Sequence, residues 1–150
     1  ITGPTIVQID DKSLLIRITT ELAGELGKRV TYEKSISEPN AIICCSSSWW
    51  LKNHYQIHRP KQLIIGVLPI ASLSSPLTAS RVEAHKKKGL DWFRKLLLPE
   101  ALNIFERSIV PIRQNNGRLA ILDGRLRSRS WGKEFLEILR PMAELHRLLP

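Results

Sequence analysis

Arginines on a helix that leads into an apolar strand are the residues of this sequence best suited to chemistry. Between Leu98 and Asp123 the chain reads LPEALNIFERSIVPIRQNNGRLAILD, and Arg107 and Arg113 lie in its helical part. A guanidinium donates two parallel charge-assisted hydrogen bonds to a phosphate and cannot lose its proton. The stretch therefore predicts a helix that presents positive charge to a phosphate. Alternatively, Arg113 ends the helix and is attracted to its C-terminal carbonyls.

A second group of candidate residues is Ser48, Trp49 and Trp50, which follow an apolar run. Exposed tryptophans stack on the bases of single-stranded nucleic acid. Two adjacent tryptophans cannot face the same way, so at least one of them is expected in the core.

A third group is basic. A phosphate backbone would be neutralised by clustered cations such as Lys86, Lys87, Lys88 and Arg94. Charge runs at helix ends are also common on plain solvated faces, so both interpretations stay open.

The overall composition favours a polyanionic partner. Among the 150 residues, 23 Lys and Arg face 14 Asp and Glu, which gives a net charge of +9 and an isoelectric point near 10.0. Nucleic acid is the first candidate for the partner, and a simply soluble basic surface is the alternative. The length predicts a single domain over residues 1–150. The chain opens into a strand without an initiator Met, and we expect a fragment of something longer.

Several classes of site find no support in the sequence. Cys44 and Cys45 are adjacent in an apolar run, which predicts buried thiols of a reducing compartment and no mutual disulfide. The scattered histidines give no metal-binding spacing. No apolar run is long enough for a membrane helix, and no signal peptide opens the chain, so we expect a cytoplasmic protein. No phosphate-binding loop with a Gly-Lys-Ser/Thr ending occurs, and ATP hydrolysis by this chain alone is not expected.

The elements that must position these residues alternate between strand and helix. Apolar or β-branched runs predict strands at 5–9, 29–32, 41–45, 62–68 and 119–122. Helical spacing, caps and terminating glycines predict helices at 13–26, 77–88, 91–98, 98–113 and 131–139. Residues 46–59 predict a loop or broken helix at a strand's carboxyl end, where open α/β sheets bind ligands. The pattern indicates an α/β fold with a mostly parallel sheet and helices on both faces.

In this order the motifs resemble a known family. AIICCSSSWWLKN, QLIIGVLPIASLSSP, DWFRKLLLPEAL, ILDGRL and RSWG succeed one another as in the second RecA-like domain of superfamily 2 DNA helicases of the DinG/XPD type. The tryptophan pair and the DWFR block look most like a cyanobacterial branch. This resemblance implies a RecA-like three-layer α/β/α fold.

The resemblance also implies roles for the arginine helix. In the family, a glutamine and two arginines of that helix face ATP and Mg²⁺ held by an upstream RecA-like domain of the same polypeptide, and the enzyme binds single-stranded DNA. The matching positions here are Glu106, Val110 and Arg113. Arg113 is then the candidate arginine finger, Glu106 a further nucleotide contact, and Arg107 a possible substitute. The isolated chain is expected to be inactive. The alternative is a degenerate RecA-like module, kept for DNA or protein binding without ATP turnover.

Overall fold

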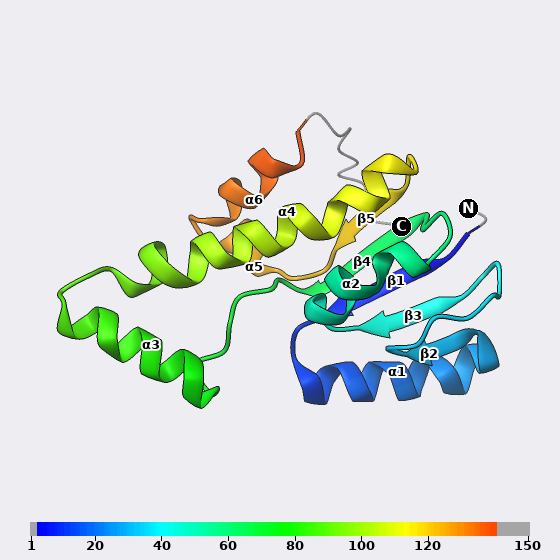
Figure 1. The fold of residues 1–150 in the computed structure, drawn as a ribbon, viewed down its shortest axis with the longest axis horizontal. Coiled ribbons are helices and arrows are strands. Elements are labelled where there is room, and N and C mark those ends of the chain that lie inside the picture. The colour runs from blue at the N-terminus through cyan, green and yellow to red at the C-terminus, as the bar shows by residue number, and fades with distance from the viewer. Residues whose placement is uncertain (1–2, 141–150) are drawn as a thin grey trace.

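The computed structural model describes residues 3–140, which form one sheet of five parallel strands (Figure 1). The strand order is β2-β3-β1-β4-β5. The strands are β1 (Thr5–Ile9), β2 (Val30–Tyr32), β3 (Ile42–Cys45), β4 (Gln62–Val67) and β5 (Arg118–Ile121). All five predicted strands are therefore present, each within two residues of the expected ends.

The helices follow the expected alternation, with two additions. They are α1 (Lys12–Leu26), α2 (Ser47–Asn53), α3 (Pro76–Lys87), α4 (Leu98–Gln114), α5 (Arg125–Ser128) and α6 (Gly132–Ile138). Short 3-10 turns η1 (Gly27–Arg29) and η2 (His54–Gln56) and a π-helical turn η3 (Phe93–Leu97) accompany them. The segment left open as a loop or broken helix is α2 followed by η2, and the short α5 was not expected.

Two apolar layers sandwich the sheet, as the sequence predicts. On one face, α1 places Leu15 against Val7, Val30 and Cys44. The opposite face is covered by α2, α4 and α6, whose large buried side chains are Trp50, Phe105 and Phe135. Helices thus cover apolar side chains on both faces of the sheet, as is usual for a parallel sheet. The three-layer α/β RecA-like fold is confirmed (Figure 1).

The connection from β4 to β5 departs from a simple crossover. It contains α3, which extends beyond the sheet, and then η3, which runs directly into α4 (Figure 1). Pro99 has no N–H for the carbonyl of Lys95, and the wide η3 turn lies at that point. A small apolar cluster of Val82, Leu96 and Leu97 holds α3, together with an ion pair between Arg81 and Glu100. The α3 segment is thus anchored separately from the main core.

Both cysteines are free and buried. Burial raises the pKa of the Cys44 thiol and raises that of Cys45 well above its ordinary value. These thiols are inert packing groups, as predicted. No helix within residues 3–140 is both long and apolar enough to cross a membrane.

Candidate nucleotide and nucleic-acid interface

The exposed side of α4 carries the residues at the family's ATP-facing positions. Successive residues of an α-helix are about 100° apart around its axis, so Glu106, Val110 and Arg113 lie within about 60° of one another. Arg107 lies about 60° beyond Val110. Glu106, Arg107 and Val110 are exposed, and we call these three residues the α4 strip. Arg113 lies at its rim.

Arg107 is the available cation of the α4 strip. Its guanidinium makes no hydrogen bond or ion pair with any other residue between 3 and 140. It stands beside Val110, whose side chain is 42% exposed. A guanidinium in this position is free to reach a group outside the chain.

Arg113 is engaged within the chain. Its Nη2 donates to the carbonyl oxygen of Ile138 at 2.6 Å and to that of Arg140 at 3.4 Å. Its Nε is buried and has no partner among the described residues. The cation therefore stabilises the C-terminal end of α6, where helix carbonyls carry partial negative charge. Arg113 thus binds carbonyls at the end of α6, whereas the alternative considered from the sequence was an attraction to the carbonyls of its own helix.

Helix α2 separates the two adjacent tryptophans. Trp50 is fully buried, and its indole N–H donates to the carbonyl of Ser108 in α4 at 2.8 Å. Trp49 is partly buried against the same core, and Ser48 is exposed. Trp50 is thus the core member of the pair, and its predicted contact with a base is wrong because no face of the ring reaches solvent. Trp49 stays a candidate for such a contact.

The amino end of α2 is occupied by the chain's own carboxylates. Asp10, just after β1, accepts the backbone N–H of Ser47 at 2.7 Å and its hydroxyl at 2.6 Å. Glu33, just after β2, accepts the hydroxyl of Ser46 at 3.0 Å. β1 lies between β3 and β4 and its carboxyl end is the switch point of the sheet, where α/β proteins commonly bind ligands. Here the backbone N–H and hydroxyl of Ser47 already donate to Asp10, so they are not available to a phosphate.

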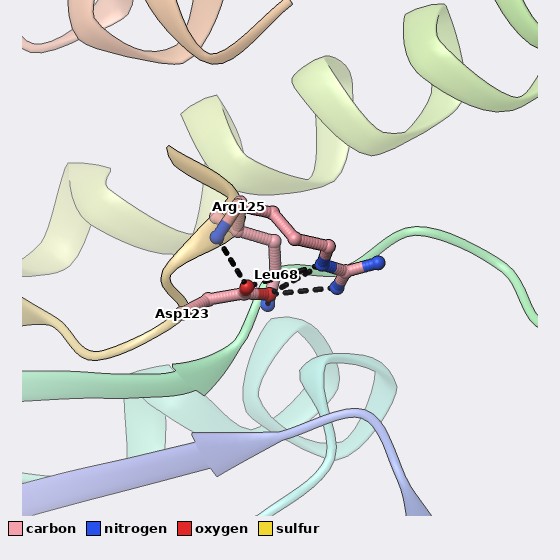
Figure 2. A network of polar contacts seen from close by, with 3 residues as sticks. All are labelled: Leu68, Asp123 and Arg125. Carbon is pink, nitrogen blue, oxygen red and sulfur yellow. Dashed lines mark hydrogen bonds and ion pairs between the residues drawn. The ribbon is translucent and has the colours of Figure 1, made fainter. Parts of the chain in front are cut away.

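A third carboxylate, that of Asp123, links the ends of the neighbouring strands β4 and β5. Figure 2 shows Asp123, just after β5, between Leu68 and Arg125. Asp123 accepts the backbone N–H of Leu68 at 2.9 Å and forms an ion pair with Arg125 at 2.6 Å. Burial raises the pKa of Asp123, but hydrogen bonds from the Arg125 side chain and from the Leu68 and Arg125 backbones outweigh it and lower that pKa below 3.8. The aspartate is therefore a structural clasp between the ends of β4 and β5.

The basic candidates lie at the far end of α3 (Figure 1). Arg94 forms an ion pair with Glu134 of α6 at 3.5 Å. The Nζ atom of Lys86 lies 5.6 Å from the ring centroid of Trp92, which the sequence reading missed. In the sequence, the one sign that Trp92 could belong to this surface is its position shortly after the lysine run. We call the following residues the Trp92 surface: Lys86, Lys87, Lys88, Trp92 and Arg94.

The structure therefore joins some predicted residues and separates others. The hydrogen bond from Trp50 to Ser108 joins α2 to α4. Trp49 on α2 and the α4 strip therefore lie on adjoining helices. The Trp92 surface lies on another part of the fold, at the end of α3. Among the described residues no three metal-binding side chains gather at one place.

Comparison with known proteins agrees with the resemblance. No protein-family model matches the chain. It is 30% identical over 123 residues to the ATP-dependent DNA helicase YoaA of Escherichia coli, covering 80% of this chain and 19% of that protein. YoaA of Haemophilus influenzae is 28% identical over 79% of this chain and 19% of its own length. The 3'-5' exonuclease DinG of Bacillus subtilis is 29% identical over 77% of this chain and 13% of its own length.

The chain thus spans at most about one-fifth of the length of these relatives. The matches do not test the expected cyanobacterial branch, which stays a prediction. The family resemblance itself is confirmed by three related sequences and by the parallel α/β sheet. Over about four-fifths of its length, the chain is therefore similar to helicases of the DinG and YoaA type.

Proposed function

We propose that this chain is the second RecA-like domain of an ATP-dependent DNA helicase. In this proposal residues 1–150 belong to a longer polypeptide, whose upstream RecA-like domain binds ATP and Mg²⁺. The closure of the second domain on that nucleotide, together with its grip on single-stranded DNA, couples hydrolysis to movement. In this proposal the isolated chain is inactive because its sequence has no phosphate-binding loop.

The observation that carries the proposal is the Arg107 guanidinium on the α4 strip, which has no partner among residues 3–140. An arginine finger stabilises the charge of a transferring phosphoryl group, and to act across a domain interface its guanidinium has to be accessible from its own domain. Arg107 meets that requirement within the described residues, whereas Arg113 is bonded to the end of α6. We therefore assign the contact with ATP to Arg107. Arg113 has the role of holding α6 against α4.

A second candidate function is a RecA-like module without ATP turnover. Two observations favour it: Val110 and Glu106 occupy positions of an arginine and a glutamine in the family, and Arg113 is committed to α6. In that case the parent protein binds DNA or protein but shows no ATPase activity that DNA stimulates.

The test is DNA-stimulated ATPase activity of the full-length polypeptide. Arg107→Ala is expected to lower the stimulated kcat about a thousandfold or more, as for other arginine fingers. Arg17→Ala, in an exposed position on α1 across the sheet, is the matched control and leaves kcat unchanged. Arg107→Ala should keep the wild-type Tm, since the side chain has no partner among residues 3–140.

Two outcomes would decide against parts of this proposal. A wild-type protein with no DNA-stimulated ATPase supports the second candidate function. Full activity of Arg107→Ala removes the assignment of Arg107. The Arg113→Ala variant cannot replace this test, because losing its bond to the Ile138 carbonyl also destabilises the packing of α6.

A further inference from the structure

The Trp92 surface combines an aromatic ring with cations. Trp92 is partly exposed at the start of the helix that continues through η3 into α4. Its ring meets Phe93 edge-on, with centroids 6.2 Å apart, and packs against the Val82, Leu96 and Leu97 cluster. These contacts hold the ring in place, so little conformational entropy is left to lose when a flat ligand stacks on it.

The cations around the ring are largely unneutralised. Lys86, Lys87 and Lys88 are exposed, and none of them makes an ion pair within residues 3–140. Arg94 has one long ion pair, with Glu134, and its side chain is 50% exposed. Two other acids are near: Glu83 lies one helical turn before Lys86 and Lys87 on α3, and Asp91 caps the turn by accepting the backbone N–H of Arg94 at 3.1 Å. The surface keeps a clear positive excess.

Neighbouring elements extend this charge. The ring centroids of Phe93 and Trp131 are 5.7 Å apart, so the junction between α5 and α6 lies beside η3. Arg129 and Lys133 flank Trp131 in the sequence, and both are exposed. The Trp131 ring packs between Phe93 and Phe135. We therefore take Trp92, and not Trp131, as the ring on which a base stacks.

We propose that the Trp92 surface binds single-stranded nucleic acid, with one base stacked on Trp92 and adjacent phosphates paired with Lys87, Lys88 and Arg94. The inference rests on the proposed function and gives it a site. The proposed stacking residue is Trp92, which directly precedes η3. Trp50 cannot have this role, because its side chain is buried in the core. A sequence-tolerant contact of this kind suits a strand that moves past the domain, since every base offers a face to the ring.

The experiment measures binding of a fluorescein-labelled oligothymidylate to the full-length polypeptide by anisotropy, at several salt concentrations. Trp92→Leu is expected to weaken binding roughly 5- to 150-fold without changing the salt slope. The double variant Lys87→Gln/Lys88→Gln is expected to lower the slope of log K against log salt by about 1.4, which is about 0.7 per phosphate contact. Tyr32→Leu, at a partly exposed aromatic on the edge strand β2, is the matched aromatic control, with an effect under about twofold expected.

An abasic oligonucleotide separates stacking from charge. Trp92→Leu should leave affinity for the abasic strand unchanged, because no base is present to stack, whereas the lysine variant still weakens it. Equal loss on both strands would overturn the stacking part of the proposal. If polyglutamate competes as well as the oligonucleotide, the surface binds acidic protein segments and the proposal is wrong.

Two further controls keep the outcomes distinct. Unfolding temperatures of each variant are compared with wild type, and the lysine variant, altered only at exposed positions, carries the test if Trp92→Leu does not fold. Wild-type affinity and salt slope in both variants, with DNA-stimulated ATPase intact, would overturn this site and leave the proposed function standing. Absence of strand binding and of stimulated ATPase in the wild-type protein would overturn both.

Discussion

The carboxyl edge of the sheet and the Trp92 surface both carry charged residues at helix ends, but they differ in how those charges are used. At the edge, Asp10 accepts hydrogen bonds from Ser47. Asp123 accepts hydrogen bonds from Leu68 and Arg125 (Figure 2). At the Trp92 surface the lysines have no ion-pair partner among residues 3–140. The first region is closed by its own groups, and the second is left open to a partner.

This difference shows that position in a fold does not by itself make a site. The switch point of a parallel sheet commonly binds ligands, yet here the donors of α2 are satisfied internally. Exposed cations around a fixed ring, by contrast, contribute little to folding, because solvated charges interact weakly with the rest of the chain. A region whose polar groups bond to one another is a structural clasp. A region whose charged groups lack such partners can act as a binding surface.

The largest expected effect comes from removing Trp50, the buried tryptophan of the helix whose amino end Asp10 caps, and Trp92 of the open surface is its counterpart. Trp50→Ala should lower the free energy of unfolding by about 3–5 kcal/mol, because it leaves a cavity under α4 and removes the donor to Ser108. Trp92→Ala, on the open surface, should cost clearly less. Urea unfolding of the 150-residue chain measures both. Equal losses would mean that the Trp92 ring is a core element and not a free platform.

An intermediate effect is expected from opening the carboxyl edge. Asp10→Ala should cost about 1–3 kcal/mol, since the N–H and hydroxyl of Ser47 lose their acceptors in a partly buried place. Ser48→Ala, on the exposed side of the same helix, is the control, with a change within about 0.5 kcal/mol. A neutral Asp10→Ala would contradict the closed-edge description. The readout is again the urea midpoint.

The smallest expected effect is the pH dependence of the Asp123 clasp. The folded-state pKa of Asp123 lies below the ordinary 3.8, so the carboxylate's contribution is fully present above that value and is lost as pH falls through the folded-state pKa. Asp123→Asn should cost about 1 kcal/mol at neutral pH. The difference from wild type should shrink below about pH 4. A difference that stays constant down to acid pH would show that the charge of Asp123 plays no part in the clasp.

Local sequence chemistry was sufficient for most of the fold. The β-branched run at Thr5–Ile9 and the apolar runs of β3 and β4 mark strands because only buried strands have such uniform composition. Asp11 caps α1 through the N–H of Leu14, and Gly27 ends that helix with a φ of 73°. Each of these signals acts within a few residues, and a sequence reading can therefore find them.

The roles of the candidate residues depended on contacts between distant positions. Which tryptophan is buried was set by the carbonyl of Ser108, 58 residues from Trp50. Arg113 differs from Arg107 because the end of α6, 25 residues further along the chain, meets only Arg113. Trp92 became a candidate when packing brought the last turn of α3 over its ring. Local sequence patterns cannot reveal such contacts, because the partners lie far apart in the chain.

The sequence alone thus determined the alternating elements, the positive charge and the order of motifs of a DinG-type domain. These follow from short-range propensities and from the residues themselves. Only the tertiary structure decided which charges remain available, because a hydrogen bond between groups tens of residues apart forms only after the sheet and its two helical layers assemble. Arg107 and the Trp92 surface stay open on that account, and Arg113, Trp50 and Asp10 do not.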